Sequence, residues 1–381
     1  MAGDGVNWQG LLKWSLSHAD GTASARNLSD EDRRWFMEAM REHSVDVIQR
    51  MKEITEVMKT PPDVLESQGV STADIEGMLD ELQEHVESID MANDLHSIGG
   101  LSPLLGYLKN SHPSIRAKAE DVVMTIVQNN PKGQQLVMET SGLEPLLSNF
   151  SSDPDLTVRS KALGAISSLI RNNKAGVMAF KLANGYAALK DALISDDPKF
   201  QRKALNLIHY LLQDNKSDCS TISELGFPKL MVHLASGDDS GVREAALAGL
   251  VELARDQSAG GASSLDKEKL QQVLRDRING IGSMDADELG AAREERQLVD
   301  AIWNACYSEP SSLREKGLLV LPGEENHGQP PDVAGKLFEP PLRAWAAHNS
   351  LRTQTQNQSA EKDEKPPLLL GPGSSSSGRN L

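Results

Sequence analysis

One pattern of apolar positions occurs four times along the chain. In each copy an alanine has an apolar residue four positions before it, and further apolar residues four and seven positions after it. Positions with this spacing lie on one face of an α-helix, so each copy predicts an amphipathic helix. The alanines are spaced by 43, 42 and 42 residues and are Ala119, Ala162, Ala204 and Ala246.

A second set of anchor residues has nearly the same period. Four glycines, each followed four positions later by a leucine, are spaced by 42, 43 and 41 residues: Gly100, Gly142, Gly185 and Gly226, with Leu104, Leu146, Leu189 and Leu230. Each unit therefore predicts a helix that begins at the glycine, a turn rich in Asp, Ser, Asn or Pro, and a longer helix. A period near 42 with two or three helices is typical of armadillo and HEAT repeats.

The predicted fold is an all-α solenoid of the armadillo/HEAT type, with four central repeats over residues 99–258. Stacked repeats bury a continuous core and leave a curved surface. We expect a helical N-terminal cap over residues 29–98 and a helical C-terminal cap over residues 262–321. Residues 1–28 are predicted to be a flexible N-terminal segment. Residues 322–381 are rich in Pro and Ser, which predicts a disordered tail.

Single amphipathic helices are expected within both caps. Residues 72–95 predict one helix whose apolar face includes Ile75, Leu79, Val86 and Ile89, and whose remaining surface is strongly acidic. That acidic surface is either the solvated side of a capping helix or a contact for a basic partner. Residues 263–281 and 284–309 predict two more helices. In the tail, "FEPPLRAW" is a short linear motif, a loose docking segment or a stretch without a role.

Composition narrows the possible partners and locations. The formal charge of −16 disfavours nucleic acid. Two distant cysteines indicate a reducing compartment rather than a disulfide framework. We find neither a run of about 20 apolar residues that could span a membrane nor a secretory signal. The expected location is the cytoplasm, and the nucleus is also compatible with these features.

The sequence contains no residue pattern that is typical of a catalytic site. The cysteines lack CxxC partners, the histidines are scattered, and no glycine-rich loop has the residues of a phosphate cradle. We therefore expect no metal, no cofactor and no enzymatic activity. A solenoid offers a binding surface instead.

Two sets of residues are candidates for partner binding on that surface. The position six residues after each anchor alanine is expected to face the groove: Thr125, Ser168, Tyr210 and Glu252. The tryptophans that peptide-binding armadillo proteins carry four residues earlier are absent, because these positions hold Asp121, Gly164, Asn206 and Ala248, so a folded partner is favoured over an extended peptide. Basic residues at the helix starts are either ordinary solvated residues or guides for an acidic partner: Arg116, Arg159, Arg202 and Arg243, with Lys118, Lys161 and Lys203.

Several segments together resemble a known family. These are "LLKWS" at Leu11–Ser15, the acidic helical segment, the four repeats, and "NACYSEPSSLREKGLLVLPGE" and "FEPPLRAW" further on. The chain is similar to the armadillo-type nucleotide exchange factors of the 70-kDa heat-shock chaperones, the family of yeast Fes and of animal heat-shock-protein-binding proteins. It looks most like their cytosolic plant members. The resemblance covers about residues 7–345.

The resemblance implies a mechanism without covalent chemistry. The repeat body would embrace one lobe of the chaperone's ATPase domain, open the nucleotide cleft, and release ADP and then the client. We expect a monomer. The segment Leu11, Leu12, Lys13 and Trp14 would either imitate a chaperone client or dock on the chain's own body. The rival hypothesis is a generic armadillo scaffold, for example an adaptor in ubiquitin ligation.

Overall fold

All regular secondary structure in the described part of the chain is α-helical. The computed structural model describes residue 34, residues 47–258 and residues 265–319. They belong to one compact unit, Met1–Leu319, and the second unit, Val320–Leu381, lies outside the described residues. The expected N-terminal segment 1–28 and tail 322–381 also lie outside them. None of the helices searched in the described residues is both long and apolar enough to cross a membrane.

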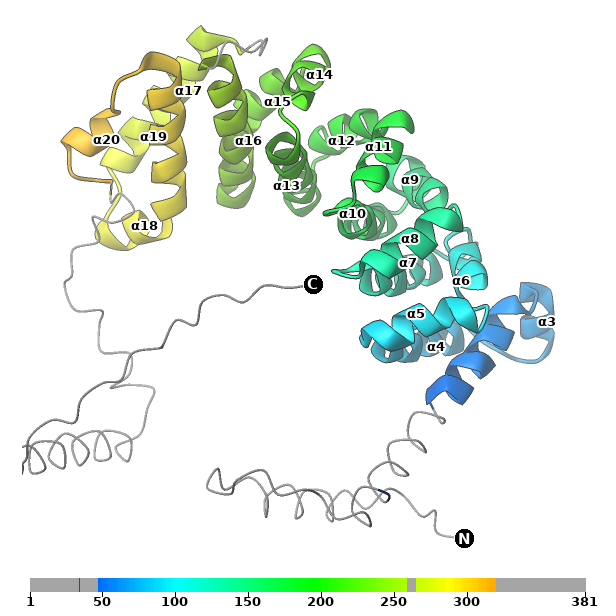
Figure 1. The fold of residues 1–381 in the computed structure, drawn as a ribbon. Helices are drawn as coiled ribbons and strands as arrows, with labels where there is room; N and C mark the ends of the chain where they lie inside the picture. Colours follow the sequence, from blue (N-terminus) through cyan, green and yellow to red (C-terminus); the bar gives the residue numbers. More distant parts are fainter. Residues whose placement is uncertain (1–33, 35–46, 259–264, 320–381) are drawn as a thin grey trace, which may run out of the picture. The chain divides into compact units, whose positions relative to one another are not determined.

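Each of the four repeats contains a first, a second and a third helix (Figure 1). The first helices are α5 (Ile89–Ser97), α8 (Pro131–Glu139), α11 (Lys174–Leu182) and α14 (Asp218–Glu224). The second helices are α6 (Leu101–Tyr107), α9 (Leu143–Ser152), α12 (Gly185–Leu193) and α15 (Phe227–Leu234). The third helices are α7 (Pro113–Val127), α10 (Leu156–Ile170), α13 (Pro198–Asp214) and α16 (Ser240–Ser258).

Further helices flank the repeats at both ends. A helical segment over residues 47–59, α3 (Pro62–Ser67) and α4 (Thr72–Val86) come before them. The helices α17 (Lys267–Gly282), α18 (Ala286–Ala291), α19 (Arg293–Tyr307) and α20 (Ser312–Glu315) follow them. One continuous cluster of buried apolar side chains runs from Met51 to Leu313.

The third helices form one layer. In Figure 1 they stand side by side, and α4 and α19 extend the layer beyond α7 and α16. The four anchor alanines lie on α7, α10, α13 and α16, and the exposed fraction of each is 0%. A methyl group at these positions lets neighbouring helices pack at the density of a protein interior. The predicted repeat is therefore confirmed at its anchor residues.

The glycine anchor of the fourth repeat is out of register by one residue. Gly100 is the N-cap of α6 with φ −87°, and a Cβ there would come within 2.5 Å of the Leu95 side chain. Gly226 instead has φ +83°, close to the +79° of Gly99. Only residues that tolerate the left-handed region adopt such a φ readily. Gly226 is thus equivalent to Gly99, and Phe227 occupies the place of Gly100.

The leucine that accompanies Gly226 is shifted in the same way. Leu230 is only partly buried, whereas Met231 is fully buried. The equivalent residues of the first three repeats are likewise 0% exposed: Leu104, Leu146 and Leu189. Because a glycine serves both a left-handed turn and a tight helix start, the sequence pattern alone does not distinguish the two registers.

Paired asparagines mark the boundary between repeats. Asn129 adopts φ +52°, and the Oδ1 atom of Asn130 accepts a hydrogen bond from the Gly133 amide at 3.1 Å. The same arrangement recurs over residues 172–176. Asparagine tolerates the left-handed region and is a favoured N-cap. The pattern Asn-Asn-x-x-Gly is therefore a start signal for the first helices, and our sequence analysis missed it.

Two of the helices expected in the caps are each interrupted. The single helix predicted over residues 72–95 is wrong, because Ser88 has an extended backbone with ψ 126° and separates α4 from α5. As a result Ile89 is 54% exposed and does not continue the apolar face of α4. The helix predicted over residues 284–309 is divided at Ala292 into α18 and α19.

Candidate partner-binding surface

Equivalent positions of the third helices lie on the solvent-facing side of the third-helix layer. Residues two and six positions after each anchor alanine are half-buried or exposed in all four repeats. They are Asp121 and Thr125 on α7, Gly164 and Ser168 on α10, Asn206 and Tyr210 on α13, and Ala248 and Glu252 on α16. The four expected groove residues thus occupy one equivalent column, and their role in binding stays a prediction.

Three side chains of this column make polar contacts within the chain. The Thr125 hydroxyl accepts a hydrogen bond from Gln83 Nε2 on α4 at 3.2 Å. The Tyr210 hydroxyl accepts one from the backbone amide of Asn172 at 2.7 Å. Glu252 pairs with Arg255 of its own helix at 3.0 Å. These groups are partly occupied by contacts within the chain, so they present only part of their surface to a partner.

Three of the four candidate arginines cap the preceding helix. The position three residues before the anchor alanine holds Arg116, Arg159, Gln201 and Arg243. Each of these side chains donates to backbone carbonyls in the last turn of the second helix of its repeat or in the turn that follows it. These carbonyls are those of Asn110 and Ser111, Phe150, Leu193 and Ser195, and Gly237 and Asp238. Carbonyls at helix ends lack partners within the helix, so this position has a structural reason to hold a long donor.

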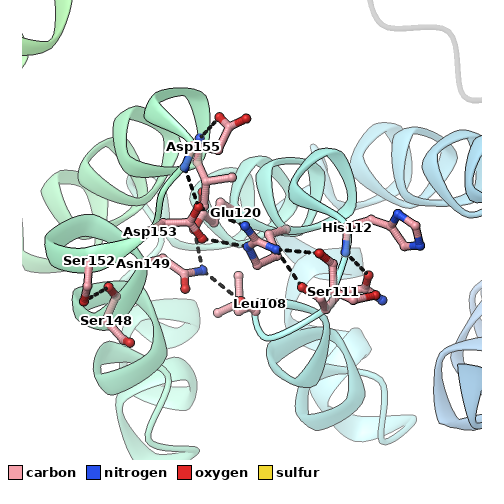
Figure 2. A network of polar contacts seen from close by, with 12 residues as sticks. Leu108, Ser111, His112, Glu120, Ser148, Asn149, Ser152, Asp153 and Asp155 are labelled. Carbon is pink, nitrogen blue, oxygen red and sulfur yellow. Dashed lines mark hydrogen bonds and ion pairs between the residues drawn. The ribbon is translucent and has the colours of Figure 1, made fainter.

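Arg116 is held further by a buried carboxylate from the next repeat. Its Nε and Nη2 atoms donate to the two oxygens of Asp153 at 2.7 and 2.9 Å (Figure 2). The side chains of Arg116 and Asp153 are 11% and 5% exposed. A charge that is paired and buried in this way offers little to a partner's electrostatic field. Arg116 therefore contributes mainly to the contact between the first and second repeats.

A buried carboxyl lies beside this ion pair. Asn149 Nδ2 donates both to the Leu108 carbonyl and to Glu120 Oε1, each at 2.8 Å (Figure 2). Glu120 is 0% exposed. Burial raises the pKa of Glu120 to about 8, although the hydrogen bond from Asn149 lowers it in part. This group is thus largely protonated at neutral pH.

Arg243 joins the last repeat to the C-terminal helices. It donates two hydrogen bonds of 3.0 Å to the carboxylate of Glu295 on α19, and Arg277 on α17 donates a third at 2.6 Å. Glu295 is 1% exposed. Burial alone would raise the pKa of this carboxyl, but the bonds from the two arginines outweigh it and lower the pKa. Arg243 is committed to this triad.

Lysines on the third helices also have partners across the seams between repeats. Lys118 pairs with Asp80 on α4, and Lys161 pairs with Asp121 on α7 at 2.6 Å. Lys203 Nζ donates to Ser160 Oγ at 2.8 Å. These contacts tie α4, α7, α10 and α13 into one layer.

Exposed positive charge without a carboxylate partner gathers at the start of α13. We call Lys199, Arg202 and Lys203 the α13 cluster, and all three are exposed. Across residues 47–258 and 265–319, no ion pair involves any of the three. Of the four candidate arginines, Arg202 is the exposed one without an ion pair in this part of the chain, whereas Arg159 also lacks an ion pair there but is half-buried and donates to the Phe150 carbonyl. The candidate segment of Leu11, Leu12, Lys13 and Trp14 lies outside the described residues.

Comparison with known proteins identifies the family of this chain. Residues 8–95 match the family model described as "Nucleotide exchange factor Fes1". Residues 91–224 match the "SIL1/FES1/HPBP1 C-terminal domain", so the two matches together extend over more than half of the 381 residues. The chain belongs to the Fes1/SIL1/HPBP1 family. Its members are armadillo-type nucleotide exchange factors of Hsp70, and this chain is one of them.

Named relatives of this Fes1/SIL1/HPBP1 member come from animals and fungi. Hsp70-binding protein 1 of Rattus norvegicus is 27% identical over 315 residues, which are 80% of this chain and 87% of the relative. The Homo sapiens protein of the same name is also 27% identical over 315 residues, with 86% of its length covered. The Hsp70 nucleotide exchange factor FES1 of Mycosarcoma maydis is 31% identical over 220 residues, which are 55% of this chain and 56% of the relative.

Solved structures confirm the fold class of this Fes1/SIL1/HPBP1 member. A designed armadillo repeat protein, YIII(Dq)4CqI, superposes with a TM-score of 0.53 at 17% identity and covers 67% of this chain and 99% of its own. A second designed armadillo protein, solved with the peptide (KR)4, gives the same TM-score at 18% identity. At this identity the likeness concerns the fold alone.

Proposed function

We propose that this chain binds the ATPase domain of a 70-kDa heat-shock chaperone, promotes release of ADP and thereby releases the bound client. The observation that carries the proposal is family membership together with an unbroken layer of third helices. Relatives named Hsp70-binding protein 1 and Hsp70 nucleotide exchange factor FES1 support the choice of partner.

The exchange step needs only differential affinity. A protein that binds the open, nucleotide-free ATPase domain more tightly than the ADP-bound form shifts the population towards the open form. Moving this equilibrium from 1:99 to 99:1 takes a preference of about 10⁴-fold. In this mechanism the exchange factor makes and breaks no covalent bond.

Stiffness of the third-helix layer is what lets binding displace a lobe. A body that bends to fit the closed chaperone would bind both forms equally and shift nothing. The paired lysines and the buried Arg116–Asp153 and Arg243–Glu295 contacts join successive helices and oppose such bending. We assign the α13 cluster the role of meeting an acidic part of the ATPase domain.

The remaining features of the proposal concern the N-terminal segment and the setting. The segment with Leu11, Leu12, Lys13 and Trp14 imitates a client and keeps the released client from rebinding. The chain acts as a monomer in the cytoplasm. Both statements rest on the sequence pattern and on the resemblance of this segment to its family.

Release of labelled ADP from the chaperone tests the proposal. We expect the purified full chain to accelerate loss of fluorescent ADP from a preloaded 70-kDa chaperone. We expect the same acceleration with the isolated ATPase domain of the chaperone. A chain that binds the chaperone without changing the rate would instead be a scaffold of the adaptor type.

A further inference from the structure

A hollow lies between the second helix of the last repeat and the first helix that follows the repeats. Helices α15 and α17 enclose about 360 Å³ there. Its apolar floor is formed by Pro228 and Val232, both buried, and by the half-buried Val273. We call this hollow the α15–α17 groove. None of its lining residues belongs to a third helix, so it is separate from the surface assigned to the chaperone.

The rim of the groove is basic. Lys229 and His233 line it from α15, and Lys269 lines it from α17; all three are exposed. The carboxylate on the rim, Asp266, caps α17 by accepting from the Lys269 amide at 3.2 Å, and lies 4.0 Å from its Nζ. Two lysines thus face one carboxylate, which pairs with Lys269, and Lys229 has no ion-pair partner among the described residues. On a chain with a formal charge of −16, such a rim is electrostatically distinct.

Size and charge together define the occupant. A hollow of about 360 Å³ is at the small end of ligand-binding pockets and accommodates a few side chains rather than a folded domain. Salt screens charges that are more than about 8 Å apart at physiological ionic strength, so the acidic surface elsewhere on the chain has little effect on this groove. The charge of the bound segment is therefore set by the lysines on the rim. Carboxylates flanking an aliphatic side chain complement both the rim and the floor.

We propose that the α15–α17 groove binds an acidic peptide segment of a second partner protein, with aliphatic side chains against Val232 and Val273 and carboxylates at Lys229 and Lys269. The site is independent of the third-helix layer. It would let one chain hold the chaperone and another protein at the same time.

Fluorescence anisotropy of a labelled peptide of alternating glutamate and leucine tests this proposal. We expect the full chain to bind this peptide, and a lysine–leucine peptide of the same length to bind much more weakly. The double variant Lys229→Gln with Lys269→Gln should lose about tenfold in affinity, because each exposed ionic contact is worth up to about 1 kcal/mol. The matched control is Lys132→Gln with Lys174→Gln, two exposed lysines on first helices.

Three results of the binding assay would overturn the proposal. They are equal affinity of the wild type and the groove variant, an equal loss in the control variant, and equal binding of the lysine–leucine peptide. The ADP-release rate of the groove variant separates this site from the proposed exchange function. An unchanged rate supports two independent sites, whereas a rate that falls in parallel with peptide affinity would merge the groove with the chaperone surface and contradict the claim of a second partner.

Discussion

At the scale of single residues, the buried Glu120 links stability to pH. Its carboxyl is 0% exposed and lies beside the Arg116–Asp153 pair, where burial holds its pKa at about 8. The unfolded chain has the ordinary value of 4.5. A raised pKa means that the folded state retains a proton that the unfolded state loses. The stabilisation from this proton is complete below pH 4.5 and disappears as the pH rises towards 8.

Replacement of Glu120 by Gln should therefore stabilise the protein selectively at high pH. Gln keeps an oxygen for Asn149 and does not titrate, so thermal unfolding should show a variant-minus-wild-type difference that grows by roughly 2–4 kcal/mol between acid and mildly alkaline pH. Glu144→Gln, at an exposed position of α9, is the control and should show no such trend. A difference that does not change with pH would contradict a protonated Glu120.

Single residues also show which features of the charged positions cannot be predicted from sequence alone. The regular spacing of Arg116, Arg159 and Arg243 was visible, but their partners were not. Asp153 lies 37 residues after Arg116, and Glu295 lies 52 residues after Arg243. Pairing across such distances depends on how the repeats stack, which no local pattern encodes. The alanine anchors were predictable because their spacing follows from helix geometry within one repeat.

At the scale of helices, the triad of Glu295 with Arg243 and Arg277 connects three elements. It joins α16, α17 and α19, the last repeat and the helices after it. Helix boundaries within the flanking regions were less predictable than those of the repeats. The predicted helix is interrupted at Ser88, although no glycine or proline is nearby. The interruption occurs where α5, the first helix of the first repeat, begins.

Loss of the Glu295 carboxylate should loosen the C-terminal helices. Glu295→Gln leaves the buried Arg243 and the half-buried Arg277 short of a counter-charge, and breaking a buried pair costs about 3–5 kcal/mol. Because the arginines lower the pKa of Glu295, the stabilisation is present above its ordinary value of 4.5 and is lost as the pH falls below it. Urea unfolding at neutral pH should show the loss, while the exposed neighbour Glu294→Gln should leave stability unchanged. Equal stability of the two variants would contradict a structural role for the triad.

At the scale of the whole molecule, the repeat class followed from one period of apolar residues. The period predicted an all-helical solenoid and four repeats, and the structure and its armadillo neighbours confirm the fold class. The available part of the partner-binding surface did not follow from the period, since three of four candidate arginines are engaged in the turns between helices. Which basic residues are exposed depends on how the helices of the layer pack. Within the part of the chain that the structure describes, the exposed basic residues without an ion pair that we assign to partner binding are those of the α13 cluster.

The N-terminal segment should act on client release and not on nucleotide exchange. In the variant with Leu11, Leu12 and Trp14 changed to Ala, we expect the ADP-release rate to stay at the wild-type value and release of a labelled client peptide to slow. A variant with Asn7, Gln9 and Ser17 changed to Ala is the control. If ADP release fell together with client release, the segment would belong to the folded body rather than imitate a client.

The most direct test of the third-helix layer as the chaperone-binding surface is the ADP-release rate of charge-reversed variants. Lys199→Glu with Arg202→Glu reverses two of the three charges of the α13 cluster. The control, Lys132→Glu with Lys174→Glu, reverses two exposed lysines on first helices and has the same net charge as the α13 variant. The account predicts that wild type and control accelerate release alike, and that the α13 variant is about tenfold slower at low salt, with a smaller deficit at high salt. Equal acceleration by the α13 variant and the control at every salt concentration would contradict it.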